Sequence, residues 1–151
     1  MSLQFAYRQF IVRRPLLTLG GQMARPRPVI DVTIIGPAGT SIMLGLLDTG
    51  ADDTVFPDWV AGRIGIDLAQ APVVSSVGVG GVPSLLHVAQ VALRIADNKE
   101  RREWTTQVGF TSAAMRHPLL GYAGFLQFFD ATFFGERQVV ELTVNSSYPG
   151  T

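Results

Sequence analysis

The stretch Leu46-Leu47-Asp48-Thr49-Gly50-Ala51-Asp52-Asp53-Thr54-Val55 decides the fold and most of the chemistry of this chain. It follows an almost wholly apolar run, residues 42–47, which predicts a strand buried on both faces. The polar segment that begins at Asp48 is rich in turn-forming residues, and the extended pattern resumes at Thr54. An acid on a tight turn after a buried strand is unusual, because burial strips water from the carboxylate. Asp48 is therefore the first candidate for a catalytic group.

A pair of such carboxylates has a specific chemical use. Two carboxylates about 3 Å apart repel each other by roughly 5.5 kcal/mol at an effective dielectric constant near 20. The pair therefore holds a single proton between its two members. The ionised member can accept a proton from water while the protonated member donates to the carbonyl oxygen of a peptide bond. Hydrolysis by this route needs no covalent intermediate.

The ten residues from Leu46 to Val55 resemble the active-site segment of the retroviral aspartic proteases, the retropepsins. Further segments between about Arg27 and Thr143 are similar to elements of that family in composition and order. They are an arginine-proline-led strand at 27–34, a glycine-rich flap at 77–82 and an apolar-apolar-glycine element at Leu119-Leu120-Gly121. The resemblance implies an all-β fold, a retropepsin-like closed β-barrel that forms half of an acid protease, with a flap hairpin and one short C-terminal helix.

The residue patterns independently predict a mostly β-protein, because β-branched segments are bounded by glycine and proline throughout. A short helix is predicted to begin at Pro57, and the spacing of four apolar residues between 125 and 129 predicts a helix over Tyr122–Asp130. We divide the chain into residues 1–26, an N-terminal extension or extra strand, and residues 27–151, the retropepsin-like domain. Strands are predicted over residues 5–12, 29–35, 42–47, 73–79, 82–95, 103–110 and 138–144.

The resemblance also implies a set of site residues. Asp48 is the expected catalytic residue, in a loop completed by Thr49, Gly50 and Ala51. The residues expected to contact substrate are Asp52 and Asp53 from the same loop, and Val79, Gly80 and Gly81 from the flap.

One position departs from the viral pattern. Viral members carry an arginine directly after the apolar-apolar-glycine element, where it would pair with the acid at Asp52. This chain has Tyr122 instead. Arg27 and Arg14 are the candidates for the missing partner of Asp52.

Only one Asp-Thr-Gly triplet occurs, and 151 residues are too few for two lobes that each supply an aspartate. A catalytic chain must therefore form a homodimer with the site on its two-fold axis. We expect a homodimeric aspartic endopeptidase that takes an extended peptide or protein substrate under its flap. The alternative is a retropepsin-fold module that dimerises or binds peptides with little proteolysis. An ordinary capped turn at Asp48 is an equally good interpretation of the motif taken alone.

The composition excludes several other classes. The chain has no cysteine, which removes disulfides, thiolate nucleophiles and cysteine-based zinc sites, and we expect no metal or cofactor. Zero net charge disfavours nucleic acid, and no apolar run approaches the ~20 residues of a membrane span. The first thirty residues hold five arginines and no acid, which we interpret as the solvent side of an edge strand and linker. Eleven arginines against a single lysine favour a bacterial, cytoplasmic protein.

Overall fold

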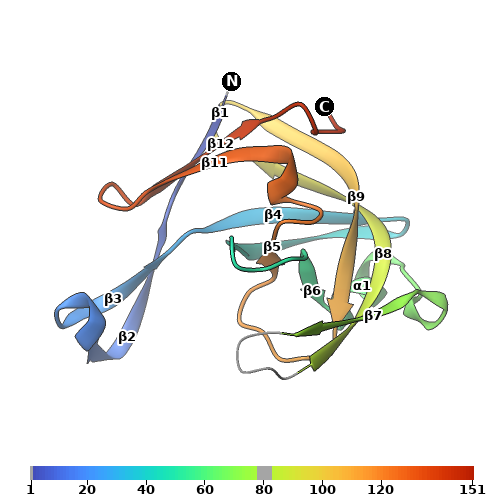
Figure 1. The fold of residues 1–151 in the computed structure, drawn as a ribbon, viewed down its shortest axis with the longest axis horizontal. Helices are drawn as coiled ribbons and strands as arrows, with labels where there is room; N and C mark the ends of the chain where they lie inside the picture. The colour runs from blue at the N-terminus through green and yellow to red at the C-terminus, as the bar shows by residue number, and fades with distance from the viewer. Residues whose placement is uncertain (1, 78–82) are drawn as a thin grey trace.

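The computed structural model describes residues 2–77 and 83–151 and consists mainly of strands (Figure 1). The α-helix is α1, Asp58–Ile64, and the short 3-10 helices are η1 (Leu17–Leu19), η2 (Leu68–Gln70) and η3 (Leu126–Phe128). The strands are β1 (Ser2–Ala6), β2 (Arg8–Leu16), β3 (Gln22–Arg27), β4 (Val29–Gly36), β5 (Gly39–Leu47), β6 (Val55–Pro57), β7 (Val73–Val77), β8 (Pro83–Ala96), β9 (Arg101–Thr111), β10 (Leu119–Leu120), β11 (Phe129–Phe134) and β12 (Val139–Val144).

Strands β4, β5, β10, β6, β9 and β8 pair in that order and close into a ring. The ring closes because β4 also pairs with β8, from Thr33 opposite Arg94 to Ile35 opposite Ala92. β10 is only two residues long, yet it lies parallel to β5 and antiparallel to β6 and so joins them. The all-β fold with a closed arrangement of strands, predicted from the sequence, is confirmed.

The core fills this ring and the space beneath α1. Alternate residues of β4 point inward, and Val32 and Ile34 are fully buried. The helix α1 buries Val60, Ala61 and Ile64 against the same core. Gly36 lies so close to α1 that a Cβ there would stand 2.4 Å from the backbone oxygen of Ile64, which accounts for glycine at the end of β4.

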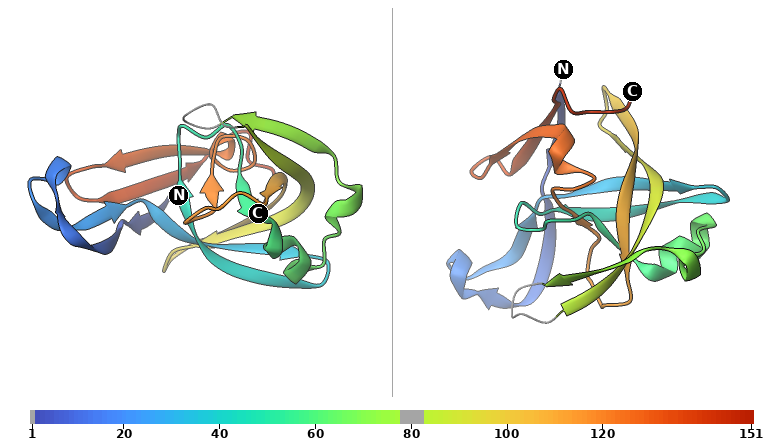
Figure 2. Two further views of the ribbon diagram at one scale, coloured as in Figure 1. Left: turned by 90° about the horizontal axis from the view of Figure 1, so that it is seen from below. Right: turned by 45° about the vertical axis from the view of Figure 1, so that its right-hand side comes forward.

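A second sheet, of order β1-β12-β11, packs at the end of the molecule where both termini lie (Figure 1). β1 pairs along its whole length with β12, from Ser2 opposite Thr143 to Ala6 opposite Val139. After Tyr7, β2 and β3 form a separate two-stranded hairpin that projects from the lower left of the body in Figure 1, and Figure 2 gives two further views of it. We call this hairpin, residues 8–27, the arm.

Three local predictions were wrong. The helix expected over Tyr122–Asp130 does not form: the chain makes only η3 and then enters β11. Gly124 adopts φ +92° there, which ends regular helix geometry, and the backbone before it is bonded to another loop. Residues 42–47 are not buried on both faces, since Ile42 is 69% exposed. The strand expected at 5–12 is divided at Tyr7 into β1 and β2.

In the region where a flap is expected, β7 and β8 form an antiparallel hairpin that pairs from Val73 opposite His87 to Val77 opposite Pro83. Its glycine-rich tip, with Val79, Gly80 and Gly81, lies outside the described residues. No helix within the described part of the chain is long and apolar enough to cross a membrane.

Candidate active site

Asp48 begins a tight turn directly after β5. Its backbone N–H donates to the Leu120 carbonyl at 3.1 Å, which fixes the end of the strand. The Gly50 N–H donates to Oδ1 of Asp48 at 2.9 Å, and the Ala51 N–H donates to the Asp48 carbonyl at 3.2 Å. One carboxylate oxygen is thus oriented by the loop's own backbone, while Thr49 and Gly50 remain exposed to solvent. Asp48 is half-buried as a residue, and one hydrogen bond orients its carboxylate.

β10 wedges between the strand that enters the turn and the strand that leaves it. Leu119 lies opposite Leu46 of β5 and also opposite Val55 of β6, and Leu120 lies opposite Leu47. The Leu120 side chain packs against Gly45. A Cβ added to Gly45 would stand only 2.7 Å from Cδ1 of Leu120. The apolar-apolar-glycine element therefore packs against the Asp48 loop, as the resemblance implied.

The residues after β10 hold the far half of the same loop. The Tyr122 and Ala123 N–H groups donate to the carbonyls of Ala51 and Asp52 at 2.9 and 2.8 Å. In return, both the backbone N–H and Oγ1 of Thr54 donate to the Ala123 carbonyl, at 3.1 and 2.8 Å. The loop from Asp48 to Thr54 is thereby bonded at both ends to one short segment, which makes it rigid.

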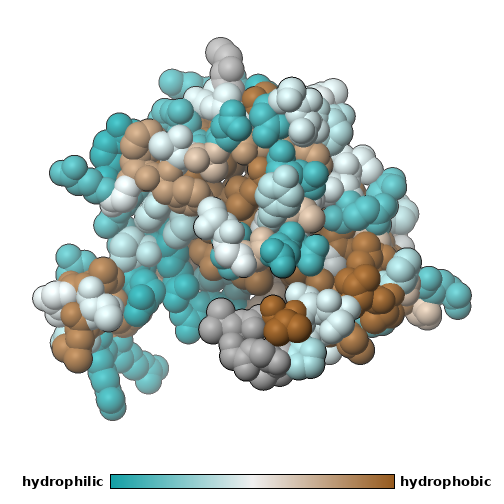
Figure 3. All heavy atoms as spheres, in the orientation of Figure 1, coloured by the Kyte–Doolittle hydropathy of each residue, from teal (hydrophilic) through white to brown (hydrophobic). Residues whose placement is uncertain are grey.

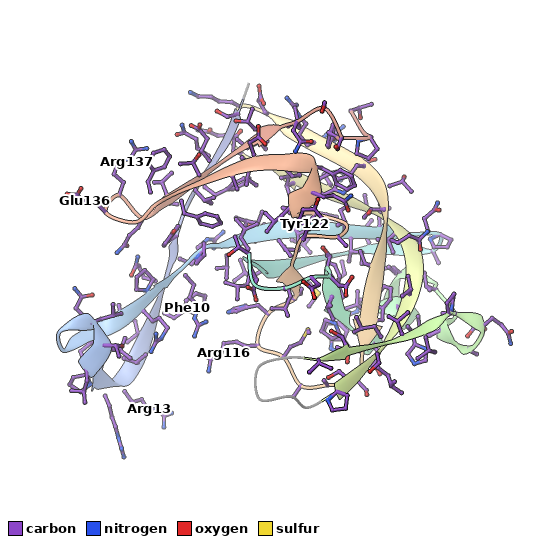
Figure 4. All side chains as sticks on the ribbon, in the orientation of Figure 1. Phe10, Arg13, Arg116, Tyr122, Glu136 and Arg137 are labelled. Atoms are coloured by element: carbon purple, nitrogen blue, oxygen red, sulfur yellow. The ribbon has the colours of Figure 1, made fainter. Side chains whose placement is uncertain are left out.

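The structure brings the loop residues predicted for the site together and leaves the partner of Asp52 open. Asp52 is exposed, and Tyr122 beside it is 64% exposed (Figure 4). Among the described residues the ion pairs are Arg8–Asp31, Arg94–Glu103 and Arg102–Glu100. Neither Arg14 nor Arg27 therefore pairs with Asp52 within residues 2–77 and 83–151. In the same residues no three His, Cys, Asp or Glu side chains gather as a metal site would require.

A cleft of about 310 Å³ opens beside the loop, and sequence reasoning missed most of it. Its apolar wall is formed by Leu46, Val55 and Leu119, the three residues that β10 brings together. The other walls come from the end of β3, from the β7–β8 hairpin, and from β9 with the loop between β9 and β10. Those lining residues are Arg27, Ser76, Ser84, Leu86, Thr111, Ala113, Ala114, Met115, Arg116 and His117.

Basic groups crowd one side of this cleft. Burial lowers the pKa of His117, and the positive charge of Arg27 lowers it further. Burial also lowers the pKa of Arg27, with the neighbouring Arg116 and Arg25 adding repulsion. For this basic side of the cleft, the sequence signal was Arg27, which precedes the predicted strand at 29–35. The loop carrying Arg116 and His117 has no recognisable motif.

These features define the fold of the retropepsin-like aspartic proteases. The chain is similar to the crystal structure of a retropepsin-like aspartic protease from Rickettsia conorii, with a TM-score of 0.51. The two share 14% sequence identity, and the match covers 94% of this chain and 90% of that chain. The EIAV protease complexed with the inhibitor HBY-793 matches with a TM-score of 0.38 and 22% identity, over 63% of this chain and 81% of that one. No protein-family model and no curated protein matches the sequence.

Proposed function

We propose that the chain is a homodimeric aspartic endopeptidase in which Asp48 of each copy supplies one of two catalytic carboxylates. The observation that carries this proposal is the way the structure positions Asp48, a half-buried residue at the end of β5. The Gly50 N–H orients its carboxylate, and its backbone N–H donates to the Leu120 carbonyl. A capped surface turn would not need a second strand threaded beneath it. The cleft that begins two residues before Asp48 offers room for a substrate side chain.

In this proposal the two Asp48 carboxylates share one proton and activate a water molecule between them. The ionised carboxylate takes a proton from the water, which attacks the peptide carbonyl carbon, and the protonated carboxylate donates to the carbonyl oxygen. The carboxyl that took the water's proton then donates it to the nitrogen, the C–N bond breaks, and the other carboxylate recovers a proton from a diol hydroxyl, so no covalent bond forms between enzyme and substrate. Asp52 and Asp53 accept hydrogen bonds from substrate N–H groups, and Val79, Gly80 and Gly81 of the flap cover the substrate from the other side.

The partner in this proposal is a second copy of the chain. Thr49 and Gly50 lie exposed at the face where a second Asp48 loop must meet the first. The arm carries large apolar side chains that water surrounds in the single chain, with Leu17 91% and Ile11 80% exposed (Figure 3). Exposed apolar groups gathered on a projecting hairpin are typical of a contact surface. Within the N-terminal extension, residues 1–26, we therefore assign the part that belongs to the arm to contacts with the second copy, while β1 pairs with β12 of its own chain. The bacterial, cytoplasmic setting stays a prediction.

The decisive test compares the wild type with Asp48→Asn on an unstructured protein substrate between acidic and neutral pH. We expect cleavage by the wild type and none by the variant, because an amide cannot share the proton. Asp130→Asn is the matched control, since Asp130 is an exposed residue of β11, and it should cleave like the wild type. Sedimentation should show the same dimer for all three proteins.

Two outcomes would contradict the proposal. Equal cleavage by the wild type and Asp48→Asn would remove Asp48 from the chemistry. A dimer that binds peptides but cleaves at no pH would instead support the alternative, a peptide-binding module with the retropepsin fold.

A further inference from the structure

The cleft beside the Asp48 loop joins an apolar floor to a basic rim. Leu46, Val55 and Leu119 form the floor, while Arg27, Arg116 and His117 stand at one side. We propose that this cleft recognises an acidic substrate side chain, whose carboxylate is bound by Arg116 together with Arg27. This specificity rests on the proposed endopeptidase function and names the class of residue that the enzyme prefers near the cleaved bond.

The charge of the rim has no counterpart in the cleft. None of the described residues that line it is an aspartate or glutamate. The Arg27 Nε and the His117 Nε2 are both buried without a hydrogen-bond partner among the described residues. A buried donor left without an acceptor costs free energy, and a carboxylate is the acceptor that suits a guanidinium best. An acidic side chain that enters the cleft therefore relieves the repulsion between Arg27 and Arg116 and offers an acceptor to their guanidinium groups.

The arm holds this basic rim in place from behind. The Phe10 ring of β2 lies 5.4 Å from the ring of His117, and the guanidinium of Arg27 lies over the same Phe10 ring at 5.9 Å. Figure 4 shows Phe10 on the arm and Arg116 on the loop between β9 and β10, in the space between the arm and the flap. The aromatic ring attracts the cation without neutralising it, so the charge remains available to a ligand.

The cleft is close enough to Asp48 to act on a residue near the cleaved bond. Leu46 precedes Asp48 by two residues, which spans about 7 Å along an extended chain. Ser76 and Ser84, from the β7–β8 hairpin, also line the cleft. A substrate side chain held in the cleft would have its stem against the leucines and its carboxylate at the rim.

In the proposed dimer, the exposed Asp52 of the second copy would compete with the substrate for Arg27. Such a pair would hold the dimer together and leave Arg116 alone to read the substrate. Arg116 is exposed and forms no ion pair within the described part of the chain, so its replacement should leave the fold intact.

The test uses ten-residue peptide mixtures that are identical except that one position, scanned along the peptide, is fixed as Glu or Gln. At one position we expect the wild type to have a kcat/KM about tenfold higher for Glu, the usual effect of one charge-assisted hydrogen bond. Arg116→Gln should lower that ratio severalfold, because the substrate carboxylate then keeps Arg27 as its only partner of the two arginines. Arg137→Gln, on the turn between β11 and β12, is the matched control and should keep the preference (Figure 4).

Equal kcat/KM for Glu and Gln mixtures at every position, or a full preference retained by Arg116→Gln, would overturn the inference. For Arg27→Met, a reduced preference with an intact dimer supports it. If Arg27→Met dissociates, its dimer can be restored at high protein concentration. A restored dimer that keeps the full preference for Glu overturns the role of Arg27. Fluorescence polarisation with the Asp48→Asn protein separates the two proposals. Tighter binding of the Glu mixture there supports acidic recognition even if the wild type cleaves nothing, and equal binding overturns it.

Discussion

Gly121 offers a direct test of whether the segment after β10 positions the Asp48 loop. It is buried, and a Cβ at this residue would stand 2.3 Å from the Asp53 carbonyl oxygen and 2.7 Å from that of Ala51. Both neighbours are backbone atoms, so no side chain can rotate to make room. In Gly121→Ala the loop must retreat by roughly 1 Å, because close-packed atoms do not interpenetrate.

That displacement should have two measurable consequences. Overpacking of this kind costs about 1–3 kcal/mol, which lowers the Tm of a chain of this size by about 3–10 °C. The retreat also stretches the 2.9 and 2.8 Å bonds that the Tyr122 and Ala123 N–H groups make to the loop. A catalytic group misplaced by about 1 Å loses on the order of a hundredfold in rate. We therefore expect Gly121→Ala to lose about 1–3 kcal/mol of stability and on the order of a hundredfold in kcat.

Thermal denaturation followed by circular dichroism gives the first quantity, and cleavage of the unstructured substrate gives the second. Gly62→Ala is the matched control, because it makes the same chemical change in α1 at a site with nothing within 4 Å. Alanine there should leave activity unchanged and stabilise the helix by up to about 1 kcal/mol. A Gly121→Ala protein with the wild-type Tm and turnover would refute the positioning role of this segment.

Two further predictions concern stability. Trp104→Phe should lower the free energy of unfolding by about 2–4 kcal/mol in urea, because it opens a cavity and leaves the Gly124 carbonyl without the Trp104 Nε1–H that donates to it at 3.0 Å. Trp59→Phe, at a largely exposed site, should cost less than about 1 kcal/mol. Equal losses of unfolding free energy in the two variants would contradict the structural role given to Trp104. Burial lowers the pKa of His117, so the unfolded chain takes up its proton first and wild-type stability should fall as pH drops below about 6.5. His117→Gln should lack that part of the fall. If urea unfolding shows that the difference in unfolding free energy between the two proteins does not change with pH, the prediction is wrong.

The sequence was most informative where several local preferences agree. The run from Leu46 to Val55 combines an apolar strand, a turn-forming acid and a small residue at Gly50, and the structure forms a strand and a tight turn there. Leu119-Leu120-Gly121 could be placed against that turn only through the family resemblance. Two residues cannot show a strand period, and the pairing of β10 with β5 joins positions more than seventy residues apart in sequence.

The failures lie where tertiary contacts override a local pattern. Phe125, Phe128 and Phe129 have helical spacing, but they gather around Trp104 from the end of a turn and the start of a strand. Ile42 lies in an apolar run, yet its face of β5 is left to solvent in this chain. Periodicity reports which residues avoid water, and it cannot report whether the surface that covers them belongs to a helix, another strand or a second copy.

The loop between β9 and β10 explains how recognition and catalysis can be separate in this fold. Its ends are fixed, because Thr111 is buried at the end of β9 and Leu120 is buried beneath the Asp48 turn. Between them, residues 112–114 and Arg116 are exposed, and the loop's side chains line the cleft rather than the core. Substitutions there change what the cleft binds. The Asp48 carboxylate is oriented by Gly50 and its loop is bonded to residues 120–123, so these bonds stay in place. A change such as Arg116→Gln should therefore alter the choice of substrate without altering the chemistry that follows.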